Sequence, residues 1–171
     1  EIRDFETAQI AIRASLTGHL VLSTLHTNSA VAALTRLTDM GVEPFLISSS
    51  LSGVVAQRLV RRVCRDCGSL EEPTGREKQI FAEANVEIDQ VNRGRGCASC
   101  NNTGYRGRIA IHEVLTIDDH IRELIMSSAS ASQIRNYVVE NDFKFLLHDG
   151  LDKVSQGLTT TEEVLRVATI E

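Results

Sequence analysis

Residues 17–28 read Thr-Gly-His-Leu-Val-Leu-Ser-Thr-Leu-His-Thr-Asn, and the expected fold is built around this segment. Its centre, Leu-Val-Leu at residues 20–22, is a short apolar run that contains neither Gly nor Pro. Such a run is typical of a strand that is buried on both faces of a parallel sheet. Polar residues follow at positions 23–28 and lead into a helical pattern. Because open α/β sheets bind ligands beyond the carboxyl ends of their strands, we expect functional side chains there.

Two histidines flank the apolar run, His19 at its start and His26 at its end. A lone histidine is more often a structural residue than a functional one. Their position by itself therefore leaves a structural and a functional role open for each of them.

Helical patterns lie on both sides of this segment. Asp4 is expected to cap a helix that carries apolar residues on one face and ends at Gly18. Asn28 is expected to cap a second helix, which ends at Gly41. A third helix opens at the Glu-Pro pair of residues 43–44, because proline is tolerated in the first helical turn.

Strand patterns cover residues 53–60 and 109–117, and a short helix is expected over residues 77–84. From Asp118 onward the pattern is entirely helical, with a capping-box sequence, Thr-Thr-Thr-Glu, at residues 160–163. Helices that alternate with short apolar strands predict an α/β layer architecture.

The composition suits a folded domain with a smaller appendage, since 42% of the 171 residues are hydrophobic. The net charge of −5 does not favour nucleic-acid binding. No segment approaches the roughly 20 apolar residues that a membrane-spanning helix needs. The chain does not begin with Met, and we expect it to be part of a longer protein, whose targeting signals it would not reveal.

The four cysteines form two matched Cys-x-x-Cys pairs, Cys64 with Cys67 and Cys97 with Cys100. Two intervening residues allow both thiolates of a pair to reach one ion, and two pairs complete a tetrahedron. Four sulfur ligands leave no open coordination position, so we expect a structural zinc ion. Two disulfides are an alternative, but no secretory context supports them. A thioredoxin-like redox pair is another, and it would leave the second pair unexplained.

Arginines cluster beside both cysteine pairs, and a basic cluster near a zinc site is one sign of nucleic-acid binding. The acidic net charge argues against such binding, and Tyr105 is the only nearby aromatic residue on which a base could stack. We therefore expect no nucleic-acid partner, and keep a non-enzymatic zinc-ribbon binding module as the alternative of another class. The arginines concerned are Arg58, Arg61, Arg62, Arg65, Arg93, Arg95, Arg106 and Arg108.

Several of these segments together resemble one protein family. Residues 1–8 (Glu-Ile-Arg-Asp-Phe-Glu-Thr-Ala), residues 17–28, residues 57–60 (Gln-Arg-Leu-Val) and the four cysteines occur in the order found in secretion motors. The chain resembles the C-terminal half of the type II secretion ATPases (the E proteins) and of the related type IV pilus assembly ATPases. The resemblance covers nearly the whole chain, and it identifies residues 1–8 as the end of the Walker B region and residues 17–28 as the His box.

The resemblance implies catalytic roles for three residues. Glu1 corresponds to the carboxylate that orients the water attacking ATP, and His26 to a donor that senses the γ-phosphate. Arg3 would reach a phosphate or a neighbouring subunit, although an ion pair with Asp4 is an open alternative. Three further residues are expected to support nucleotide binding or subunit contacts: His19, Arg108 and Arg36.

The resemblance also implies a RecA-like α/β core that lacks its first half, since the chain contains no Gly-x-x-x-x-Gly-Lys-Ser/Thr loop to cradle phosphates. We expect residues 1–61 to be the C-terminal part of that core. Residues 62–108 would form a tetracysteine zinc insert, and residues 109–171 the final strand and a helical C-terminal subdomain. Such a chain is not expected to hydrolyse ATP alone.

For the full-length protein the resemblance implies a cytoplasmic homo-hexamer, peripheral at the inner membrane, that hydrolyses ATP with Mg²⁺. Hydrolysis would drive pseudopilus assembly and type II protein export, with inner-membrane secretion platform proteins as partners. Type IV pilus assembly is the alternative within the family.

Overall fold

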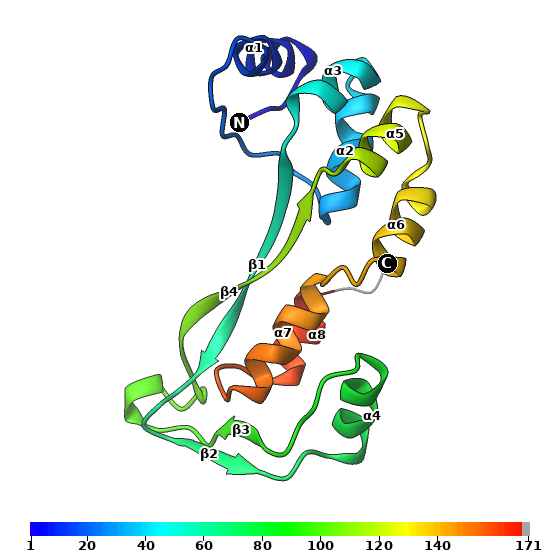
Figure 1. Cartoon of the computed structure of the whole chain (residues 1–171). Coiled ribbons are helices and arrows are strands. Elements are labelled where there is room, and N and C mark those ends of the chain that lie inside the picture. Colours follow the sequence, from blue (N-terminus) through cyan, green and yellow to red (C-terminus); the bar gives the residue numbers. More distant parts are fainter. Residues whose placement is uncertain (169–171) are drawn as a thin grey trace. The chain divides into compact units, whose positions relative to one another are not determined.

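The computed structural model describes residues 1–168 and divides into two compact units (Figure 1). Unit 1 consists of residues 1–56 and 114–143, and unit 2 of residues 57–113 and the chain from residue 144 on. Neither unit coincides with one of the three predicted segments, and the boundaries of those segments stay a prediction. Within residues 1–168, no helix combines the length and the apolar character that a membrane span requires.

Unit 1 is a group of helices held by an aliphatic core. The helices are α1 (Phe5–Leu16), α2 (Ala30–Asp39), α3 (Pro44–Ser50), α5 (Asp119–Met126) and α6 (Ala131–Glu140). Helix α1 contacts α3, α3 contacts α2 and α5, and α6 contacts α2 and α5. All of these helices except α3 place buried apolar residues three or four positions apart, as an amphipathic helix does. Their buried apolar residues include Ala8, Ile12, Val31, Leu34, Leu37, Ile47, Ile121, Ile125, Ile134 and Val138.

Local capping residues set the helix boundaries in unit 1. The Asp4 carboxylate accepts the N–H of Thr7 at 2.8 Å, as predicted. Asp118, where the helical pattern was predicted to start, caps α5 in the same way. The cap of α2 is Ser29 rather than the predicted Asn28, so that prediction was wrong by one residue. Gly41 follows the end of α2 with φ +90°, a left-handed conformation in which a glycine avoids the Cβ penalty.

The predicted buried strand at residues 20–22 is wrong. Residues 19–27 have no regular secondary structure, and Leu20 and Leu22 are 88% and 87% exposed. Ile2 donates its N–H to the carbonyl of Thr24 at 2.9 Å, which brings residues 1–3 beside this segment. A strand inside a parallel sheet needs partner strands on its edges and helices on its faces. Within residues 1–168, however, the strands pair only as residues 53–63 with residues 105–116 and residues 68–71 with residues 91–94.

Two long strands carry the chain from unit 1 to unit 2 and back. Strand β1 (Gly53–Val63) pairs with β4 (Tyr105–Thr116). Both predicted strands are confirmed: β1 extends residues 53–60 to residue 63, and β4 begins four residues before residue 109 and ends one residue before residue 117. Shorter strands β2 (Gly68–Glu71) and β3 (Val91–Gly94) form an antiparallel pair within unit 2, with Gly68 opposite Gly94. Together with the flanking helices, these strands make the chain an α/β protein.

Unit 2 has one apolar core, to which the cysteine-rich region and the C-terminal helices both contribute. Phe81 of α4 (Gly75–Glu83) and Val91 of β3 are buried in the same cluster as Val60, Leu151 and Val164. Helix α4 begins two residues before the predicted residue 77, because Thr74 and Glu77 form a capping box there. The remaining helices are η1 (Ala98–Cys100), α7 (Leu146–Ser155) and α8 (Thr161–Val167).

Candidate nucleotide and metal sites

The carboxylate of Glu1 lies between His26 and Arg3. Its Oε1 is 2.6 Å from Nε2 of His26, and its Oε2 accepts a hydrogen bond from Nη2 of Arg3 at 2.7 Å. The structure therefore brings together the three residues predicted to be catalytic. The alternative pairing of Arg3 with Asp4 does not form, since Asp4 caps α1 instead.

Local structure explains why this trio assembles. The backbone bond from Ile2 to Thr24 holds residues 1–3 alongside the segment that leads to His26. The Arg3 hydrogen bond lowers the pKa of Glu1 below its ordinary value, so the carboxylate is ionised at neutral pH. His26 is 86% exposed, and a ligand from solvent can reach it. An ionised carboxylate with two exposed donors beside it suits a group that orients water near a phosphate.

Of the three residues predicted to support nucleotide binding, His19 and Arg36 lie in unit 1 and Arg108 lies in unit 2. The ring of His19 stays near the end of α1, where its Nδ1 is 3.2 Å from the carbonyl oxygen of Ala14. Arg36 is exposed in the last turn of α2, and no hydrogen bond or ion pair joins it or His19 to Glu1. Arg108 is exposed on β4 in unit 2. Their roles stay predictions.

The four cysteine sulfurs form one cluster. All four Sγ atoms lie within 4.8 Å of one another, and three of the separations are 3.9 Å (Cys64 to Cys97), 3.8 Å (Cys67 to Cys100) and 3.7 Å (Cys97 to Cys100). A tetrahedral ion with metal–sulfur bonds of about 2.3 Å separates its sulfurs by about 3.8 Å. The cluster therefore has the dimensions that a four-sulfur zinc site requires, and its sulfurs are not bonded as disulfides.

The backbone around the second pair, residues 97–100, is shaped for this cluster. The N–H groups of Cys97 and Gly104 point at Sγ of Cys100, at 3.2 and 3.3 Å. Although burial raises the pKa of the Cys100 thiol, these N–H groups and the hydrogen bonds with the thiols of Cys97 and Cys67 together outweigh it and lower that pKa to about 6. Burial is also the main reason why the pKa of Cys67 is raised to about 12. A bound Zn²⁺ ion would hold all four sulfurs as thiolates.

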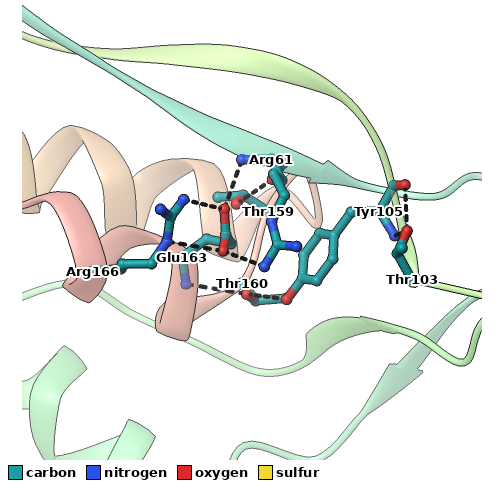
Figure 2. A network of polar contacts seen from close by, with 7 residues as sticks. All are labelled: Arg61, Thr103, Tyr105, Thr159, Thr160, Glu163 and Arg166. Atoms are coloured by element: carbon teal, nitrogen blue, oxygen red, sulfur yellow. Dashed lines mark hydrogen bonds and ion pairs between the residues drawn. The ribbon is translucent and has the colours of Figure 1, made fainter.

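Sequence reasoning missed a buried carboxylate, Glu163, that binds the strand leading to the first cysteine pair. Glu163 was predicted to complete a capping box in α8, and Thr160 does accept the N–H of Glu163 at 3.4 Å. Its side chain, however, is 1% exposed and binds Arg61 and Arg166 rather than the backbone of Thr160 (Figure 2). The sequence contains the cationic partner, Arg61, but no local pattern links it to Glu163, because the two residues are 102 positions apart.

Residues 1–166 match the family model described as "Type II/IV secretion system protein". The chain belongs to this family. One secretion-family relative, the type II secretion system ATPase E of Vibrio cholerae, is 54% identical over 167 residues, which is 98% of this chain and 33% of that protein. Another, the type IV pilus assembly ATPase PilB of Thermus thermophilus, is 51% identical over 168 residues, 96% of this chain and 19% of that protein.

Two solved structures have the same secretion-ATPase fold. The pilus retraction motor PilT with bound ADP matches 99% of this chain and 38% of its own, with a TM-score of 0.64 at 23% identity. The ATPase DotB of Legionella pneumophila matches 98% of this chain and 36% of its own, with a TM-score of 0.62 at 20% identity. The chain spans about a third of the length of the curated type II relatives that it matches.

Proposed function

We propose that this chain forms part of a homo-hexameric secretion motor that hydrolyses ATP with Mg²⁺, and that Glu1 orients the attacking water. The observation that carries the proposal is the Glu1 carboxylate held between His26 and Arg3 at 2.6 and 2.7 Å. Phosphoryl transfer from ATP depends on positioned groups and charge rather than on covalent chemistry by the protein. A preorganised, ionised carboxylate flanked by two donors is suited to that task.

The tetracysteine cluster would supply a fixed scaffold rather than chemistry. In our proposal a zinc ion binds Cys64, Cys67, Cys97 and Cys100, and four sulfur ligands leave it no position for a substrate. The sulfur separations of 3.7 to 3.9 Å support this assignment.

In the cell, we place the motor in the cytoplasm at the inner-membrane face, with secretion platform proteins as partners. Type II export is the first choice, because several relatives named for the type II system are about 50% identical to this chain. Pilus assembly is the second choice, since PilB is 51% identical. Three of the eight arginines near the cysteines, Arg61, Arg93 and Arg106, are paired with acidic residues, which supports the expectation that the chain has no nucleic-acid partner.

The decisive experiment uses a longer protein that joins this chain to a phosphate-binding loop of the Walker type. Replacing Glu1 with Gln keeps the shape of the side chain but removes the proton acceptor, so kcat should fall by about a hundredfold or more while nucleotide affinity survives. A matched control is Glu6→Gln, an equal charge change on the exposed side of α1. Unchanged kcat with weaker nucleotide binding in the Glu1 variant would disprove the assigned role.

The chain without that loop should hydrolyse ATP negligibly, since nothing in it cradles the β- and γ-phosphates. Robust turnover by the purified 171-residue chain would contradict this part of the proposal. Salt-sensitive binding of the same chain to DNA would instead favour the alternative, a zinc-ribbon binding module.

A further inference from the structure

A buried carboxylate ties the last helix of unit 2 to the strand that leads into the metal cluster. Oε2 of Glu163 accepts the backbone N–H of Arg61 at 3.0 Å, and Oε1 accepts its guanidinium N–H at 2.7 Å. Arg166, one turn further along α8, donates to Oε2 at 2.9 Å. Figure 2 shows both arginines converging on this one side chain. Arg61 is the third residue before Cys64, so the network ends beside the first metal ligand.

Backbone hydrogen bonds continue this link to the first cysteine pair. Thr159 donates its hydroxyl to the carbonyl of Arg61 at 2.8 Å, and Val63 donates its N–H to the carbonyl of Leu158 at 3.0 Å. Cys64 then donates its N–H to the carbonyl of Gly104 at 2.9 Å. The turn before α8 therefore holds the backbone on both sides of Arg62, directly before the first ligand.

A second route joins the same helix to the other cysteine pair. The guanidinium of Arg61 lies over the ring of Tyr105, 4.2 Å from its centroid, and the Tyr105 and Thr160 hydroxyls are 3.0 Å apart. Tyr105 donates its N–H to the Thr103 hydroxyl at 3.3 Å (Figure 2). Thr103 in turn donates to the carbonyl of Cys100 at 2.6 Å. Both cysteine pairs are thus connected to the N-terminal end of α8.

We propose that Glu163 is a positioning residue for the metal centre, and that docking of α8 through Glu163 is coupled to zinc binding by the four cysteines. The inference rests on the assignment of zinc to that cluster. An ionised carboxylate is stable in a protein interior only when donors surround it. Two of the donors to Glu163 belong to Arg61, whose backbone is held in place three residues before Cys64. When zinc orders the end of β1, it therefore favours docking of α8. Docking of α8 in turn favours zinc binding.

Coupling of this kind is reciprocal, so the inference can be tested by measuring either zinc affinity or the docking of α8. The test uses the full 171-residue chain, reduced, with zinc affinity measured by competition against a chromophoric chelator. Glu163→Gln keeps the side-chain shape but removes the charge, and Glu162→Gln makes the same charge change at the exposed neighbouring position. We expect Glu163→Gln to weaken zinc binding about tenfold or more, the usual effect of losing a group that orients metal ligands. Glu162→Gln should stay within about twofold of wild type.

The reverse measurement is hydrogen exchange with and without zinc. Removing zinc should lower the protection of the α8 amides in wild type and in Glu162→Gln. Because the coupling is reciprocal, this loss of protection should equal the factor by which Glu163→Gln weakens zinc binding. In Glu163→Gln, zinc should no longer change the protection of α8. The amides of α2 in unit 1 serve as an internal reference, and zinc should leave them unchanged in all three proteins.

Three results would overturn the inference. Equal zinc affinity of the two glutamine variants would show that Glu163 does not position the metal centre. Protection of α8 that is independent of zinc in wild type would show that the helix docks without it. A wild-type chain that binds no zinc would remove the zinc assignment itself, and the inference with it.

If Glu163→Gln fails to fold, Thr159→Val takes its place, because valine has the shape of threonine but lacks the hydroxyl that binds the Arg61 carbonyl. This variant should weaken zinc binding severalfold relative to Glu162→Gln, and an unchanged affinity would count against the coupling.

Discussion

Nε2 of His26 lies 2.6 Å from Oε1 of Glu1, although the two residues belong to separate motifs and are 25 positions apart in the sequence. Arg3 occupies the other carboxylate oxygen at 2.7 Å. Both oxygens of the proposed water-orienting group are therefore engaged, and its direction is set by two side chains. His26 was expected to contact a phosphate, whereas in this structure it contacts the carboxylate. Its contribution to hydrolysis would then include holding Glu1 in place.

Replacing His26 with Ala in the longer protein should lower kcat about tenfold or more, with a smaller change in nucleotide affinity. The reason is that Glu1 loses one of the two contacts that orient it. Steady-state kinetics with an independent measurement of nucleotide binding separates the two effects. His120→Ala, which removes an exposed ring that stacks on Tyr137, is the control. A larger loss of affinity than of kcat would mean that His26 mainly binds the nucleotide.

Replacing Arg3 with Gln should move the acid limb of the kcat profile to higher pH. The Arg3 hydrogen bond lowers the pKa of Glu1, so the carboxylate stays ionised to a lower pH than an ordinary Glu. Without Arg3 the pKa rises toward its ordinary value, and the ionised form is lost earlier as the pH falls. An acid limb that keeps its position in the Arg3 variant would show that another group sets it.

Gly104→Ala should disrupt the metal centre far more than Gly107→Ala. Both glycines have a left-handed backbone, with φ +77° and φ +79°, so each substitution carries a conformational penalty of about 1 kcal/mol. A Cβ at Gly104 would also lie 2.5 Å from the carbonyl oxygen of Gly94, whereas a Cβ at Gly107 would meet open space. We therefore expect Gly104→Ala to lower the free energy of unfolding by more than about 3 kcal/mol.

Urea unfolding and zinc affinity of the two alanine variants would check this difference. Equal stability of the two proteins would mean that the backbones of residues 94 and 104 separate at little cost.

Cys97→Ser should abolish zinc binding and lower the hydrogen-exchange protection of the cysteine-rich part of unit 2. Structural zinc sites contribute roughly 10 kcal/mol or more of apparent binding free energy, and Cys97 lies 3.7 to 3.9 Å from two of the other sulfurs. Helix α2 in unit 1 has its own aliphatic contacts and should stay protected. Residues 20–22, which the sequence predicts to form a buried strand, cannot serve as this reference because Leu20 and Leu22 are exposed.

Metal analysis of protein purified under reducing conditions gives the stoichiometry, which we expect to be one zinc per wild-type chain. Full protection of the cysteine-rich region after zinc has been removed would show that the four cysteines have another purpose.

The sequence by itself determined the features that depend on neighbouring residues. Asp4 and Asp118 mark helix starts because a carboxylate bonds the backbone N–H three residues ahead. The Cys-x-x-Cys spacing predicts a shared site because two intervening residues bring both sulfurs of a pair to one point. The order of the motifs also indicated the family, and the comparisons confirmed it.

Only the tertiary structure decided what depends on partners distant in the chain. The apolar run at residues 20–22 has the composition of a buried strand, but a strand is buried by its neighbours, and none of the strands in residues 1–168 pairs with it. Glu163 has the spacing of a capping residue, yet Arg61 supplies stronger, charge-assisted donors from 102 positions away. Hydrogen bonds and burial depend on which groups are close in space. A local pattern therefore shows which kinds of partner a side chain can bind, and the fold determines which partner it contacts.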